Sequence, residues 1–148
     1  GCVVDTDTGT LFVGEEARGI WAVDLSSGKQ RLVDAVGDGR LTADVEGLDI
    51  YRGSRRILVA SSQGDNSYAL YGLPDGEPLA RFRIRRNVDR GIDGAAETDG
   101  VSVTADALPG FPAGILVVQD GFNIDPVENQ NFKIVDWRDV EALVASPE

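Results

Sequence analysis

The chain has 148 residues, 42% of them hydrophobic and 26% charged, which predicts a single globular domain with a core rather than a disordered chain. The formal net charge of −11 disfavours nucleic acid and anionic membranes as partners and favours cation binding. The absence of histidine excludes His-based triads and HExxH zinc sites. The single cysteine excludes an intrachain disulfide. No apolar run approaches the roughly 18 residues of a membrane span.

The first part of the chain predicts four short strands, at residues 1–5, 11–16, 20–24 and 30–35, because apolar residues alternate with polar ones there. The chain opens directly on the first of these strands, with no starting methionine and no leader, so we expect it to be a piece of a longer protein. The segment DTDTGT at 5–10 superficially resembles half a calcium loop, but it lacks the closing glutamate of an EF-hand and is interpreted as a turn.

The same order of segments returns twice. The second unit predicts strands at residues 46–51, 57–64, 68–73 and 79–85. The third unit predicts strands at residues 99–103, 115–121 and 131–137, and then a short amphipathic helix at 136–144 in place of an obvious fourth strand. A glycine stands at or near the start of the first strand in every unit: Gly1, Gly47 and Gly100.

Units of about 50 residues with three or four strands each are typical of β-propeller blades, whereas a sandwich would show no such repeat. We therefore predict an all-β fold of about three four-stranded blades, with a short C-terminal helix. The predicted boundaries are 1–42, 43–92 and 93–137 for the blades and 138–145 for the helix. Because a closed ring has roughly 4–8 blades, this is about half of a propeller. The alternative is one ordinary all-β domain whose segments resemble one another by coincidence.

Oxygen-bearing side chains recur at matched places in the units. The first strand of a propeller blade lines the central channel, so Glu46 and Asp99, at the starts of two such strands, are expected at one mouth of that channel. The ends of the second strands add Glu15, Glu16, Gln63 and Asp120, with Asn123 just beyond.

The segment DGAAETDG at 93–100 also brings Asp93, Glu97 and Asp99 together, and such carboxylates repel one another unless water or a cation separates them. Taken alone, each acid is best explained as a solvated turn residue, but the recurrence of acids at matched places in the units favours a metal site. Oxygen ligands without histidine or a repeated cysteine indicate a hard cation, and Ca²⁺ fits best because it accepts roughly six to eight oxygens in flexible geometry.

One basic cluster contains Arg81, Arg83, Arg85, Arg86 and Arg90. Arginines can grip phosphate bidentately. The first three alternate along a predicted strand, however, which favours a solvated outer edge that discourages pairing with another strand.

Five strings spread over nearly the whole chain resemble the β-propeller phytases, in that family's order. They are EEARGIW (15–21), DVEGLDIY (44–51), ASSQGDNSYALY (60–71), DG…ETDG (93–100) and VQDGFNID…NQNFKIVDW (118–137). The resemblance implies a six-bladed propeller, secreted or periplasmic, that hydrolyses phytate (myo-inositol hexakisphosphate) with Ca²⁺. It implies catalytic Ca²⁺ ions that bind substrate phosphates and activate water, without a protein nucleophile, together with structural Ca²⁺ ions.

The resemblance also implies a set of metal-site residues: Glu16, Asp44, Glu46, Gln63, Asp93, Asp99, Asp120 and Asn123. Within this set we expect Glu16, Glu46 and Asp99 to form the catalytic cluster. We expect Asp93, Asp120 and Asn123 to bind a structural ion that ties the third unit together.

Two departures from the family limit what the chain is expected to do alone. The acid that precedes the first glycine in the family is absent, and so are the lysines and arginines that hold the substrate phosphates, which lie in the family's other half. We therefore expect the isolated chain to be a poor or inactive phytase that self-associates or pairs with that missing half. The alternatives are a non-catalytic propeller stabilised by calcium and another calcium propeller hydrolase, such as a sugar lactonase.

Overall fold

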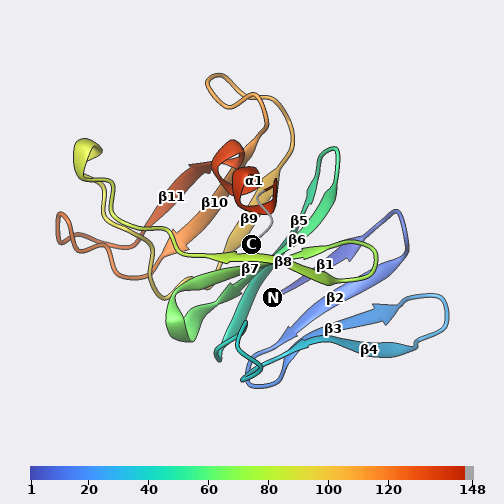
Figure 1. Ribbon diagram of the computed structural model, residues 1–148. Coiled ribbons are helices and arrows are strands. Elements are labelled where there is room, and N and C mark those ends of the chain that lie inside the picture. The colour runs from blue at the N-terminus through green and yellow to red at the C-terminus, as the bar shows by residue number, and fades with distance from the viewer. Residues whose placement is uncertain (146–148) are drawn as a thin grey trace.

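The computed structural model describes residues 1–145 as three antiparallel sheets and one C-terminal helix (Figure 1). The first sheet contains β1 (Cys2–Asp5), β2 (Thr10–Glu15), β3 (Gly19–Asp24) and β4 (Gln30–Ala35). The second contains β5 (Val45–Arg52), β6 (Arg56–Ser62), β7 (Ser67–Gly72) and β8 (Glu77–Phe82). The third contains β9 (Val101–Thr104), β10 (Ile115–Asp120) and β11 (Asn131–Asp136), and α1 (Trp137–Ala145) follows it.

Each sheet is a meander in which every strand pairs with its neighbours in sequence. The prediction of an all-β chain built from blade-like units with a short C-terminal helix is therefore confirmed, and the three sheets are compatible with part of a propeller. The predicted four strands per blade hold for the first two sheets, whereas the third has three strands within residues 1–145 because the chain enters α1 after β11. The six-bladed ring and the blade boundaries stay predictions.

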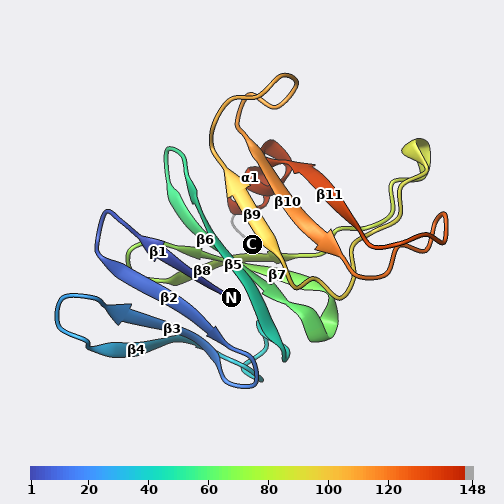
Figure 2. The same ribbon diagram turned by 180° about the vertical axis from the view of Figure 1, so that it is seen from behind.

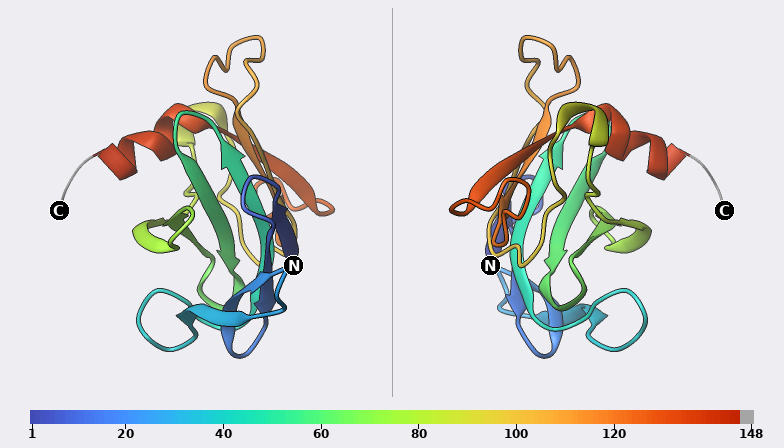
Figure 3. Two further views of the ribbon diagram at one scale, coloured as in Figure 1. Left: turned by 90° about the vertical axis from the view of Figure 1, so that its right-hand side faces the viewer. Right: turned by 90° about the vertical axis from the view of Figure 1, so that its left-hand side faces the viewer.

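The sheets stack with their first strands side by side, β5 lying between β1 and β9 (Figure 2). The helix α1 packs against β11 and β8, while the loop from β9 to β10 projects beyond the sheets (Figure 3). Within residues 1–145 no helix combines the length and the apolar character that a membrane span needs.

Two hydrophobic clusters hold the stack together. One includes Phe12, Leu48 and Leu58 and lies between the first and second sheets, and the other includes Val59 and Leu116 and lies between the second and third. The second sheet thus has both faces covered, and successive residues of β6 enter opposite clusters, as the two-residue period of a strand requires. This explains why the segment ILVASS has no polar face.

Glycine permits the first strands to approach one another. A Cβ added to Gly1 would lie 2.1 Å from the backbone oxygen of Glu46, and one added to Gly47 would lie 2.7 Å from the backbone nitrogen of Val101. The same contact therefore recurs between β1 and β5 and between β5 and β9, which is the physical reason for the repeated glycine in the sequence.

Polar contacts between the sheets reinforce this arrangement. The Arg56 guanidinium of the second sheet donates to both carboxylate oxygens of Asp5 in the first, at 2.8 and 2.7 Å. The Val103 backbone N–H donates to Asp49 Oδ2 at 2.8 Å, and the Ser61 hydroxyl donates to the Thr98 backbone oxygen at 2.8 Å. These contacts fix the second sheet against both neighbours.

The glycine contact gives a stability prediction. We expect Gly47→Ala to lower the free energy of unfolding by about 1–3 kcal/mol, because the new methyl group must push apart two backbones that cannot yield locally. Gly100→Ala is the matched control, because the nearest atom to its added Cβ is Gln119 Cβ at 3.7 Å, an ordinary contact. Urea unfolding of both variants measures the difference, and equal stabilities would contradict the proposed role of Gly47.

Candidate functional site

Three carboxylates meet where the first and second sheets adjoin. Asp44 directly precedes β5, Glu46 is the second residue of β5, and Glu16 directly follows β2. Backbone hydrogen bonds set their positions, since the Val45 N–H donates to the Glu16 carbonyl oxygen at 3.0 Å and the Gln63 N–H donates to the Asp44 carbonyl oxygen at 2.9 Å. The turn after β2 and the end of β6 are thereby attached to the start of β5.

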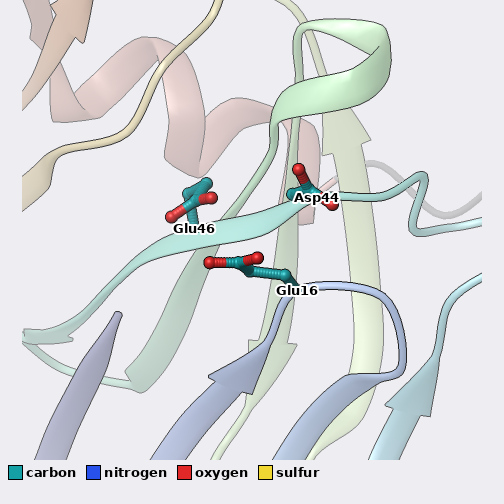
Figure 4. A group of neighbouring side chains, drawn as sticks. All are labelled: Glu16, Asp44 and Glu46. Carbon is teal, nitrogen blue, oxygen red and sulfur yellow. The ribbon is translucent and has the colours of Figure 1, made fainter.

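One ligand oxygen from each of Glu16, Asp44 and Glu46 lies within 4.8 Å of the others. Figure 4 shows Glu16 reaching from the turn after β2 towards Glu46 on β5, with Asp44 at the beginning of that strand. Glu16 is exposed, whereas Asp44 and Glu46 are half-buried, so the group is open to solvent on one side. This spacing suits three side chains that share one cation, and carboxylate oxygens are the ligands that Ca²⁺ prefers.

The pKa of Glu46 reflects how closely these carboxylates lie to one another. Partial burial raises the pKa of Glu46, and the negative charges of Glu16, Asp99 and Asp44 raise it further. Both main effects penalise the ionised carboxylate in the absence of a cation. A bound cation would reverse that penalty.

Asp99 stands beside this group. Its Oδ1 accepts a hydrogen bond from Gln63 Nε2 at 2.7 Å, and its backbone N–H donates to Gln119 Oε1 at 2.9 Å. Asp99 is exposed and close enough to raise the pKa of Glu46, but it is not among the three closest carboxylates. The structure therefore brings together the predicted Glu16, Glu46, Asp44, Gln63 and Asp99, with Asp44 more central than the sequence indicated. The catalytic role of Glu16, Glu46 and Asp99 stays a prediction.

A second polar group joins the third sheet to the segment before it, and it contains the predicted Asp93, Asp120 and Asn123. The ammonium of Lys133 lies among them, 2.6 Å from Asp93 Oδ1, 2.8 Å from Asp120 Oδ2 and 3.5 Å from Asn123 Oδ1. Asn131 Oδ1 accepts from the same ammonium at 2.8 Å. The three predicted residues do converge, but around a lysine, and a structural metal ion at this place stays a prediction.

Lys133 belongs to this group although the sequence did not indicate it. It is buried on β11, whereas its neighbours Phe132 and Ile134 are exposed, which inverts the usual polarity of a strand. The signal that could have found it is the pairing with β10, because Lys133 lies opposite the buried Val118.

In this second group, the lysine and the aspartates each stabilise the charged form of the other. The ammonium of Lys133 and the backbone N–H groups of Ile124 and Asp125 hold the pKa of Asp93 below its usual value, against the opposing effect of burial. Burial alone would lower the pKa of Lys133, but Asp120 and Asp93 outweigh it and raise the pKa above its usual value.

The arginine cluster is largely paired within the chain. Arg81 and Arg83 both pair with Asp65, and Arg86 pairs with Asp125. Arg81 lies on β8, which is the last strand of its sheet. These contacts agree with the interpretation of an outer edge.

Comparison with known proteins gives the family. The family model described as Phytase matches residues 1–147. The chain belongs to the phytase family. It is 42% identical over 149 aligned positions to a 3-phytase of Bacillus subtilis (strain 168), an alignment that covers 95% of this chain and 38% of that protein. The chain therefore spans well under half the length of this phytase.

The three-carboxylate group gives a metal-dependent stability prediction. In chelator at pH 7 we expect Glu46→Gln to raise the free energy of unfolding by about 0.5–1 kcal/mol, because it removes repulsion with Glu16 and Asp44. With calcium present the same variant should gain less stability than the parent, because it has lost a ligand.

Glu141→Gln, on the exposed side of α1, is the matched control and should change neither value. Thermal unfolding with and without calcium measures both effects. An equal gain from calcium in the parent and in Glu46→Gln would contradict a cation site at Glu46.

Proposed function

We propose that the protein containing this chain is a calcium-dependent phosphomonoester hydrolase that acts on phytate, and that this chain carries part of its active site. The proposal rests on the group formed by Glu16, Asp44 and Glu46, which is open to solvent on one side. The chain that holds this group belongs to the phytase family. The named relative is a 3-phytase, which supports phytate as the substrate.

Each residue of the site has a distinct task in this proposal. Glu16, Asp44 and Glu46 hold the cation, and Asp99 adds a fourth negative charge at its edge. Gln63 orients Asp99 through its Nε2 hydrogen bond and keeps its own Oε1 as a further oxygen ligand. When bound, calcium would neutralise the charge of a substrate phosphate and make water a better nucleophile.

The residues also limit the chemistry. The chain has no histidine, so an imidazole can serve neither as base nor as nucleophile within it. A water molecule that attacks phosphorus in line with the leaving oxygen needs no covalent intermediate with the protein. The four acids repel a phosphate unless a cation lies between them, so the proposal requires the metal for substrate binding as well as for chemistry.

The complete site is proposed to need residues beyond this chain, which spans 38% of the length of the named relative. Exposed apolar side chains on and near β11, including Val127, Phe132 and Ile134, are candidates to pack against such further segments or against a second copy. Phosphate-binding lysines and arginines are proposed to come from those segments. A secreted or periplasmic location is part of the same proposal.

The second candidate function is a non-catalytic propeller module in which calcium only stabilises the fold. The exposure of Glu16 and Asp99 favours the enzyme, because a purely structural ion is usually enclosed by its ligands. Measuring calcium binding and phosphate release together distinguishes the two functions, because a non-catalytic module binds calcium without releasing phosphate from phytate.

Phosphate release from phytate, measured on the full-length protein that contains this chain, tests the proposal. We expect calcium-dependent turnover that a chelator abolishes, and about 100-fold lower turnover in Glu16→Gln, Asp44→Asn and Glu46→Gln. Glu141→Gln should retain the parent rate. The 148 residues alone should show little or no turnover.

Two outcomes would contradict the proposal in different ways. Calcium binding without phosphate release from any phosphomonoester would support the structural module instead. Full activity in chelator, or in all three acid variants, would show that the carboxylate group is not the active site.

A further inference from the structure

Lys133 lies inside the third unit at a point where three separate segments meet. Asp93 comes from the segment that precedes β9, Asp120 ends β10, and Lys133 lies on β11. Their side chains are nearly inaccessible, with 4% exposure for Asp93, 0% for Asp120 and 7% for Lys133. A buried charge is costly unless it is paired and hydrogen-bonded, so the partners of each atom decide what the site can bind.

Every carboxylate oxygen of the two aspartates has a partner. Asp93 Oδ2 accepts from the backbone N–H groups of Ile124 and Asp125, at 2.7 and 3.3 Å. Asp120 Oδ1 accepts from the backbone N–H groups of Ala96 and Phe122, at 3.0 and 3.3 Å.

The remaining two oxygens, Asp93 Oδ1 and Asp120 Oδ2, form ion pairs with the Lys133 ammonium at 2.6 and 2.8 Å, and neither accepts a hydrogen bond within residues 1–145.

The ammonium is equally well satisfied. It donates hydrogen bonds to Asn131 Oδ1 at 2.8 Å and to Asn123 Oδ1 at 3.5 Å, and it forms ion pairs with Asp93 and Asp120. The site therefore contains two negative charges, one positive charge and four backbone donors, and the ammonium lies against the two oxygens that accept no hydrogen bond.

A divalent ion does not fit this arrangement. Ca²⁺ needs roughly six to eight oxygens, and here the carboxylate oxygens are already used by N–H groups and by the ammonium. An ion close to Asp93 Oδ1 and Asp120 Oδ2 would also lie next to the positive charge of Lys133. Entry of the ion would require that side chain to leave a buried place on a strand that is paired with β10.

We propose that the ammonium of Lys133, and not a bound metal ion, is the resident cation of the site formed by Asp93, Asp120, Asn123 and Asn131. The lysine serves as a tethered counterion that attaches the segment before β9 and the end of β10 to β11. The third unit then keeps its structure in the absence of calcium. The group of Glu16, Asp44 and Glu46, in contrast, needs calcium to offset the repulsion among its carboxylates. This inference concerns a separate site and does not rest on the proposed hydrolysis.

Lys133→Met tests the proposal, because methionine keeps much of the aliphatic stem and removes the charge. In chelator, we expect the Tm of the full chain to fall by about 10 °C, since two buried carboxylates lose their counterion. Calcium should then restore part of that loss, because a divalent ion can enter once the ammonium is gone.

Lys29→Met is the matched control, since it makes the same change at an exposed position and should leave Tm unchanged. An unchanged Tm in Lys133→Met would overturn the proposal.

A measurement on the unaltered protein keeps the proposal testable if Lys133→Met does not fold. The sequence has two lysines, Lys29 and Lys133, so ¹⁵N-labelled lysine gives at most two ammonium signals. The buried, paired ammonium of Lys133 should exchange slowly with water and give a signal that is unchanged in excess calcium. Loss or a large shift of that signal on adding calcium would show that the metal displaces the lysine, and would overturn the proposal.

Discussion

The close approach of the first strands is the constraint on which the rest of the structure depends. Gly1 lies against the backbone of Glu46, and Gly47 lies against the backbone of Val101, at distances that no side chain would allow. Because Glu46 directly precedes Gly47, and Asp99 directly precedes Gly100, the contacts that stack the sheets also place these acids side by side. Fold and candidate site therefore share one cause, and a change that separates the strands disturbs both.

The chain handles buried and crowded negative charge in two different ways. The group of Glu16, Asp44 and Glu46 is open to solvent on one side and includes no positive side chain, and partial burial and mutual repulsion raise the pKa of Glu46. At Asp93 and Asp120 a lysine supplies the positive charge from within the chain. An exchangeable cation suits the site that we propose receives a phosphate, whereas a tethered cation suits a site that only joins segments.

The sequence predicted the strands well because its two signals have direct physical causes. Successive side chains of a strand point to opposite faces, which gives the period of two, and the repeated glycine permits close backbone approach. The sequence also predicted that Glu16, Glu46 and Asp99 would lie close together, and Glu16 and Glu46 are among the three closest carboxylates, with Asp99 beside them. It did not predict Lys133, because a lone lysine in an alternating strand is normally solvated, and only its pairing with Val118 places it inside. The central place of Asp44 depends on the Val45 and Gln63 backbone hydrogen bonds, which no local pattern specifies.

A crystal structure of the protein grown with calcium, with anomalous scattering recorded at a long wavelength, would distinguish a calcium ion held by carboxylates from the tethered ammonium of Lys133. We expect a calcium peak among the carboxylates of Glu16, Asp44 and Glu46 and none between Asp93 and Asp120, where the ammonium of Lys133 should remain. The absence of a peak at the first position, or a peak in place of the ammonium at the second, would contradict this expectation.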